Sequence, residues 1–284
     1  SRSPVVMAKN CKGFLEEDSE KPFFLYICTS DPHRGGGAAA ELPHKPDRFG
    51  NPKPGSKGYP GIKEVVYEGG MRSPCLVRNP YLKKRGIATD AMVSWVDILP
   101  TLIDLAGGKV PSDIDGKSFA PVLLGTKKTH RDKIFTTNTG DNQMNIFPIR
   151  SVRMGKYKYI HNLRPDAYHT NHSDRLRSDG RGAYWYSWDE AAKTDPKAAA
   201  IVKRYHVRPE FEFFDLDKDP NELNNLASHT KHKGKLVELR AELKKWTTSQ
   251  GDDLKPHRDP YPTSAPIPEI KRKPKKKKPK PKSK

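Results

Sequence analysis

Apolar residues in this chain occur in short blocks, and their spacing changes along the sequence. The block FFLYIC at 23–28 is continuous and follows a proline, which predicts a buried strand of the parallel type. Asp31 and His33 come next, so polar groups stand at the carboxyl end of that strand, where open α/β sheets hold their ligands. No block approaches the roughly 20 apolar residues of a membrane-spanning helix, so no membrane span is predicted.

The segment 91–108 has apolar residues at helical spacing and ends at Gly107 and Gly108. This pattern predicts a helix whose first turn lies near Asp97. Upstream of it, residues 35–61 are rich in glycine and proline and show no period, so they are predicted to form a long loop.

The second half of the chain has a different pattern. Residues 147–163 alternate between apolar and polar positions around a glycine, which predicts a hairpin, and 210–227 begins as a strand and ends in an acidic turn. Residues 233–246 place leucines and a tryptophan on one helical stripe, which predicts an amphipathic helix covering a small sheet. Residues 164–208 are charged, contain Tyr and Trp, and have too little periodicity to predict an element.

Together these patterns predict an α/β protein in three parts. Residues 1–130 are expected to form an α/β core, 131–255 a smaller α+β unit with antiparallel strands and a closing helix, and 256–284 a disordered tail rich in Pro and Lys. The net charge is +19, but ten basic residues and no acid lie in 271–284, so the rest of the chain carries only +9. A solvated tail that binds polyanions loosely is the simple interpretation, and an arm that binds nucleic acid is the alternative.

The segment KEVVYEGGMR at 63–72 concentrates candidate chemistry. The glycine pair after Glu68 allows a tight backbone turn, and Arg72 offers a planar fork of donors nearby. Lys63, at a fixed distance from that turn, is either an anion-binding group or a solvated loop lysine. His33 has the same two interpretations, a catalytic group or a hydrogen-bonded surface residue.

Several stretches together carry a family resemblance: FFLYICTSDPHR, KEVVYEGGMRSPCLV with VSWVDILPTLIDLAG, and SVRMGKYKYIHN with EFFDLDKDPNELNNLA. They resemble the sulfatases of the alkaline-phosphatase-like superfamily, most of all the N-sulfoglucosamine sulfohydrolase (heparan N-sulfatase) type, over roughly residues 5–250. The resemblance implies a partial alkaline-phosphatase-like mixed sheet with a smaller C-terminal α+β subdomain of an antiparallel sheet plus a helix.

The resemblance also implies a chemistry. In that family a formylglycine, made from Cys or Ser in a CxPSR-type motif, attacks sulfur, a calcium ion polarises the sulfate, and cationic side chains bind its oxygens. It implies a sulfuric ester or sulfamate hydrolase acting on sulfated carbohydrate in a periplasmic or secreted setting, with His33 and Lys63 as catalytic residues and Arg72 as a substrate-binding residue. The loop 138–150 can border the substrate cleft in the family, so Asp141 and Asn142 are candidates for binding sugar hydroxyls, and an ordinary surface loop is the alternative.

The sequence departs from the family pattern in its nucleophile and its metal ligands. Cys11, Cys28 and Cys75 begin neither a CxPSR motif nor a CxxC pair, and the family's Asp-Asp pair and SDNG metal segment are absent, so no metal ligand is assigned. Lys63 is either the family lysine or a residue of the upstream loop in the same register. The chain is therefore expected to be part of a hydrolase, or a deleted relative of one, that is inactive alone. The alternative is a non-catalytic polyanion-binding protein that uses its basic tail.

Overall fold

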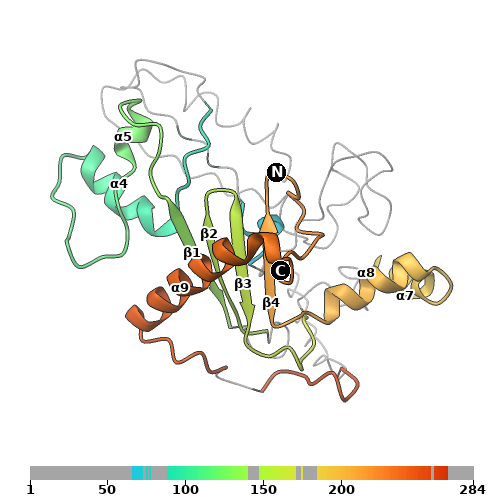
Figure 1. Ribbon diagram of the computed structural model, residues 1–284. Helices are drawn as coiled ribbons and strands as arrows, with labels where there is room; N and C mark the ends of the chain where they lie inside the picture. The colour runs from blue at the N-terminus through green and yellow to red at the C-terminus, as the bar shows by residue number, and fades with distance from the viewer. Residues whose placement is uncertain are drawn as a thin grey trace, which may run out of the picture.

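The centre of the molecule is a four-stranded antiparallel sheet with the strand order β1-β2-β3-β4 (Figure 1). The structure is a computed structural model that describes residues 66–72, 75, 77, 88–139, 147–170, 174, 184–256 and 259–267. The strands are β1 (Lys133–Asn138), β2 (Ile149–Met154), β3 (Tyr157–Asn162) and β4 (Phe211–Asp215).

The strands β2 and β3 form the hairpin that the sequence predicts. Met154 pairs with Tyr157 across the turn, and Gly155 in the turn has a φ of 55°, a backbone conformation that glycine adopts without steric cost. The predicted strand in 210–227 is confirmed as β4. The sequence does not predict β1, because its segment KIFTTN lies at the edge of the sheet and lacks a clean alternation of apolar and polar residues.

One face of the sheet packs against the start of the described chain. Side chains alternate between the two faces of a strand, and on this face Ile149, Ile160 and Phe214 form a buried cluster with Val66 and Tyr67. The short helix α3 (Glu68–Met71) continues from this cluster. The segment around Glu68 is therefore fixed to the sheet by apolar burial as well as by the polar contacts described below.

The opposite face is covered by α9 (Lys233–Ser249), which crosses the strands diagonally (Figure 1). Leu239 and Leu243 on the inner side of α9 are buried against Val152 and Phe213. The predicted amphipathic helix and its position over a small sheet are confirmed. The described part of the chain is thus a mixed α/β structure with the sheet between α9 and α3.

The predicted helix near Asp97 is also confirmed. A 3-10 turn, η1 (Trp95–Asp97), leads into α4 (Ile98–Leu105), and the chain leaves the helix at Gly107, whose φ is 74°. The short helix α5 (Ala120–Leu123) follows.

Asp97 is a buried carboxylate that ties these elements together. Its oxygens accept hydrogen bonds from the backbone N–H of Ser94 and of Lys117, both at 2.9 Å, and from the guanidinium of Arg131. Burial by itself would favour the neutral acid, but these donors outweigh it and lower the pKa of Asp97 to about 2.

The low pKa of Asp97 predicts a loss of stability in acid. The folded-state pKa lies below the unfolded value, so this contribution to the free energy of unfolding is complete above about pH 4 and is lost as the pH falls towards 2. Urea midpoints measured from pH 5 to pH 2 should fall more steeply for the parent chain than for Asp97→Asn. Parallel curves for the two proteins would contradict this assignment.

Two helices occur where the sequence predicts no element. These are α7 (Tyr184–Ala192) and α8 (Pro196–His206), which project from the sheet beyond β4 (Figure 1). Trp185 and Tyr205 bury their rings against each other with centroids 4.6 Å apart. The inner face of this pair of helices consists of large aromatic residues that also carry polar atoms. The helical spacing of purely apolar residues, from which a helix is predicted, is therefore weak in this segment.

The aromatic cluster of α7 and α8 reaches the sheet through His169. The His169 ring lies 4.9 Å from Tyr205 and 4.8 Å from Phe147, both edge to face. Burial lowers the pKa of His169 well below its ordinary value, so the ring is neutral near pH 7. Within the described part of the chain, every helix is too short or too polar to cross a bilayer. The predicted strand at 23–28 and the predicted loop at 35–61 lie outside the described residues.

Candidate functional site

The YEGG segment, residues 67–70, forms a single helical turn instead of an open loop turn. Tyr67 is extended, and its carbonyl oxygen accepts hydrogen bonds from the backbone N–H of Gly70 at 2.8 Å and of Met71 at 3.0 Å. The Met71 sulfur accepts a hydrogen bond from the Thr136 hydroxyl of β1 at 3.5 Å. The turn is therefore attached to the sheet at both of its ends.

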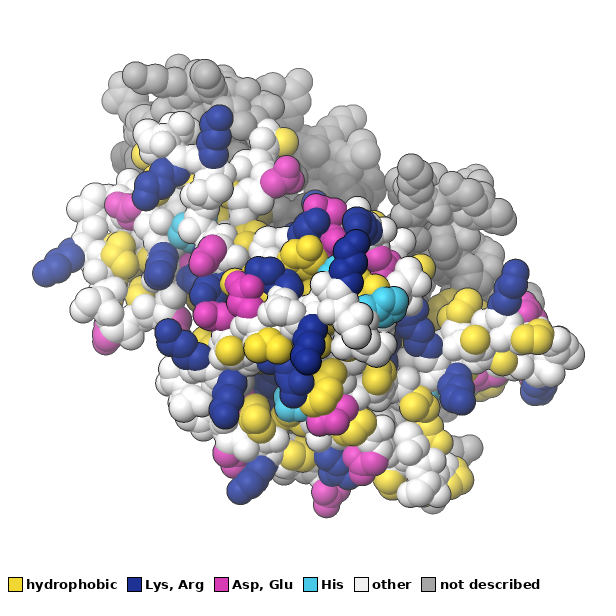
Figure 2. All heavy atoms as spheres, in the orientation of Figure 1, with side chains coloured by type: hydrophobic (Ala, Val, Ile, Leu, Met, Phe, Trp, Pro, Cys, Tyr) yellow, Lys and Arg dark blue, Asp and Glu magenta, His cyan; other side chains and the backbone are white. Residues whose placement is uncertain are grey.

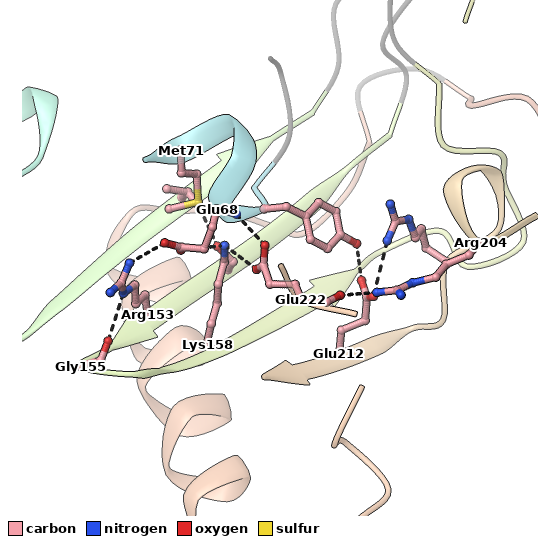
Figure 3. A network of polar contacts seen from close by, with 12 residues as sticks. Glu68, Met71, Arg153, Gly155, Lys158, Arg204, Glu212 and Glu222 are labelled. Atoms are coloured by element: carbon pink, nitrogen blue, oxygen red, sulfur yellow. Dashed lines mark hydrogen bonds and ion pairs between the residues drawn. The ribbon is translucent and has the colours of Figure 1, made fainter. Parts of the chain in front are cut away.

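Glu68 is the centre of a buried network of charges (Figure 3). One carboxylate oxygen lies 3.2 Å from the Lys158 ammonium of β3, and the other accepts a hydrogen bond of 2.5 Å from Arg153 of β2. The same ammonium lies 2.8 Å from Glu222, whose second oxygen accepts the backbone N–H of Glu68 at 2.6 Å. Glu222 thus fixes the backbone of the turn, and Lys158 and Arg153 fix its side chain.

The network is deeply buried and close to neutral. The Lys158 side chain is 0% exposed and the Glu222 side chain is 3% exposed. Burial raises the pKa of Glu222, and the nearby Lys158 charge opposes that rise. Two carboxylates face two cations, which is the condition under which buried charges are tolerated.

A second pair of contacts holds Tyr67 in place. Its hydroxyl donates a hydrogen bond to Glu212 of β4, and the Arg208 guanidinium lies 4.4 Å from the centre of its ring. Burial, assisted by Glu212 and opposed by Arg208, raises the pKa of Tyr67 well above its usual range. Tyr67 therefore acts as a hydrogen-bond donor and as a packing group near neutral pH.

Arg72 is the one predicted site residue that the structure describes. It is exposed at the end of α3, and its backbone N–H donates to the Glu68 carbonyl at 2.9 Å. The position is consistent with a donor presented to solvent from an anchored turn. His33, Lys63, Asp141 and Asn142 lie outside the described residues.

Sequence reasoning missed the residues that anchor the turn. Lys158 stands at an inward position of the β2–β3 hairpin, two residues before the buried Ile160, and a lysine at such a position needs a carboxylate partner. Glu222 follows the acidic turn after β4 and has a φ of 55°, which is rare for a residue other than glycine. The alternation with Tyr157 and Tyr159 places Lys158 on the polar face of the strand, so neither its burial nor the identity of its partners could be read from the sequence.

The described residues do not fit a calcium site. Among them, no group of three His, Cys, Asp or Glu residues is arranged to hold a metal ion. The carboxylates of Glu68 and Glu222 are already paired with Lys158 and Arg153, so they are not available as an oxygen cage for a hard cation.

Comparison with known proteins identifies the family. The family model described as N-sulphoglucosamine sulphohydrolase, C-terminal, matches residues 58–176, a range that contains the YEGG segment and Lys158. An ulvan-active sulfatase of Formosa agariphila is 31% identical over 196 residues, which are 68% of this chain and 36% of that protein. This chain belongs to the sulfatase family. Human arylsulfatase A is 33% identical to this sulfatase-family chain over 166 residues, 58% of this chain and 28% of the enzyme.

The sulfatase-family chain spans about a third of the length of the curated relatives it matches. Among solved structures, it is similar to a 2-O GAG sulfatase, with 28% sequence identity, coverage of 55% of this chain and 25% of that one, and a TM-score of 0.37.

Proposed function

We propose that this sulfatase-family chain carries the anion-binding part of a sulfuric ester or sulfamate hydrolase that acts on sulfated carbohydrate. Its relatives include ulvan-active sulfatases and an N-acetylglucosamine-6-O-sulfatase of Bacteroides thetaiotaomicron, the latter 27% identical over 198 residues. The observation that carries the proposal is the anchored YEGG turn, because a binding group must be held by its surroundings before it can discriminate one anion from another.

The proposed roles follow from the chemistry of a sulfate ester. Lys63 and Arg72, on either side of the anchored Glu68, bind the sulfate oxygens and stabilise the charge that develops on them. His33 contacts the sulfate or protonates the leaving oxygen, and Asp141 and Asn142 hold sugar hydroxyls. Glu68 positions the YEGG turn and does not contact the substrate, since both of its carboxylate oxygens are paired with Lys158 and Arg153.

The chain by itself is expected not to turn over substrate. A sulfate ester is cleaved when a nucleophile attacks sulfur, and the 284 residues contain no CxPSR or SxPSR motif from which the family's formylglycine is made. Cationic groups lower the barrier of an attack but cannot replace the attacking group.

Binding of a small sulfated sugar tests the proposal. Lys63→Ala and Arg72→Ala should each weaken the binding of glucosamine 6-sulfate about tenfold, because each removes a charged donor to the sulfate. Isothermal titration calorimetry measures the affinity, and Lys193→Ala, which removes an exposed cation paired with Glu190, is the matched control. If both site variants bind as tightly as the control, the assignment of these two cations is wrong.

The alternative function, polyanion binding through the basic tail, has a separate signature. Under this alternative, replacing the ten basic residues of 271–284 by serine in the 284-residue chain would abolish the binding of sulfated sugars. Under the proposed function, the same variant would still bind the small sulfated sugar.

A further inference from the structure

A shallow groove lies between α9 and the segment that precedes it, on the face of the sheet opposite the YEGG turn. It has a volume of about 290 Å³, near the lower end of the range for ligand sites in proteins. One wall is the segment before α9 and the other is α9 itself. The lining residues are Ala227, Ser228, His229, Thr230, Lys233, Leu236, Val237 and Arg240.

The lining surface is mainly apolar, includes the two cationic residues Lys233 and Arg240, and contains no carboxylate among the described residues. Lys233 and Arg240 are seven positions apart on α9, so they lie on one side of the helix, roughly 10 Å apart along its axis. Lys244 continues the same row. Figure 2 shows dark blue and cyan groups beside yellow ones where α9 crosses the sheet. An anion in the groove would meet positive charge on the helix side and hydroxyl donors on the other.

The acids of α9 lie away from this row and are already neutralised. Glu238 pairs with Lys235 at 2.5 Å, and Glu242 pairs with Lys133 of β1 at 2.8 Å. In a helix of 3.6 residues per turn, both glutamates point more than roughly 100° away from Lys233. The Lys233 backbone N–H donates to the Thr230 carbonyl, but its ammonium group makes no ion pair or hydrogen bond with any residue in the described ranges, so its charge is available to a ligand.

The wall opposite the helix is held by Asn225. Its side chain accepts the backbone N–H of Phe213 and of Ala227, both at 3.0 Å, and donates to the carbonyl of Phe211 at 2.9 Å. Arg240 is positioned as well, with its guanidinium 4.5 Å from the centre of the Phe211 ring. The groove is therefore built before a ligand arrives, which limits the entropy lost on binding.

From these contacts we propose that the α9 groove is a second binding site, for a sulfated polysaccharide strand. Lys233, Arg240 and His229 bind sulfate groups, and the apolar floor of Leu236 and Val237 receives the faces of the sugar rings. Single-stranded nucleic acid is disfavoured, because it is bound by large aromatic platforms for its bases, and His229 is the one aromatic side chain in the lining, which contains no Phe, Tyr or Trp. The choice of a sulfated carbohydrate rests on the proposed function, whereas the groove and its charge do not.

Two sites on opposite faces of one sheet predict a dependence on ligand length. A monosaccharide occupies only the YEGG site, while a chain that binds the groove gains affinity from the row of cations on α9. Groove variants should therefore weaken the binding of an oligosaccharide and leave the binding of glucosamine 6-sulfate unchanged. This separates a failure of the groove from a failure of the proposed function.

The test uses the 284-residue chain with the ten basic residues of 271–284 replaced by serine, and a heparin-derived octasaccharide as the probe. Lys233→Ala/Arg240→Ala should weaken octasaccharide binding about tenfold. Lys231→Ala/Lys245→Ala removes the same charge from positions that do not line the groove and should change the affinity less than about twofold. Lys233→Ala alone, which removes no ion pair and no side-chain hydrogen bond of the described residues, should weaken octasaccharide binding about threefold.

Three results would overturn the proposal. Equal effects of the two double variants would show that only net charge matters. Retention of the octasaccharide after removal of its sulfates would exclude sulfate recognition. Equal competition by a single-stranded DNA octamer would make the groove a general polyanion site. A circular dichroism melting curve for each variant shows whether a loss of binding reflects a loss of folding.

Discussion

Lys158→Met is expected to lower the free energy of unfolding by about 3–5 kcal/mol, one of the two largest effects in this protein. The methionine can occupy the buried space, but it leaves the carboxylates of Glu68 and Glu222 facing each other with only Arg153 as a cation. An uncompensated buried charge is costly because water cannot reach it. The YEGG turn loses its support at the same time.

Urea unfolding followed by circular dichroism measures this loss. Lys193→Met is the control, because it replaces a lysine whose ion pair with Glu190 is exposed and should cost less than about 1 kcal/mol. The double variant Lys158→Met/Glu222→Gln should recover part of the stability, since it removes the charge left without a partner. If Lys158→Met unfolds at the same midpoint as the control, the buried network does not stabilise the fold.

Leu239→Ala is expected to cost about 2–5 kcal/mol. Leu239 is fully buried between α9 and the sheet, where it belongs to the cluster of Val152 and Phe213, so its removal leaves a cavity in the core. Val237, two positions earlier on the same helix, is 57% exposed. Val237→Ala therefore changes the helix propensity of α9 without leaving a buried cavity, and it should change the free energy of unfolding by less than about 0.5 kcal/mol.

The same urea experiment distinguishes these two variants. A large separation of their midpoints supports the observed docking of α9 on the sheet. Equal losses would mean that α9 does not bury its Leu239 side in solution, and the groove between α9 and the segment before it would then lose its structural basis.

The elements that were predicted correctly have apolar residues at a regular helical or strand spacing. The β2–β3 hairpin alternates around Gly155, and α9 repeats leucine at helical spacing, so local pattern and tertiary burial agree. The start of α4 was predicted from Asp97, whose side chain the structure shows accepting the N–H of Ser94. The helices α7 and α8 were not predicted, because the residues they bury, such as Trp185 and Tyr205, are aromatic and partly polar.

The sequence predicted which residue types form the candidate site, but not which residues contact one another there. The sequence singled out the glycine pair and Arg72, but it could not show that Glu68 pairs with Lys158, 90 positions later in the chain. Contacts of that separation depend on the register of the sheet, which places Lys158 of β3 opposite Arg153 of β2. The assignments of Lys63, His33, Asp141 and Asn142 remain predictions.

Calorimetric titration of the unmodified chain with glucosamine 6-sulfate and with unsulfated glucosamine tests the central claim most directly. The proposed recognition of sulfate by Lys63 and Arg72 predicts saturable binding of the sulfated sugar and an affinity for glucosamine that is at least about tenfold weaker. Equal affinity for the two sugars, or binding of neither, would contradict the account.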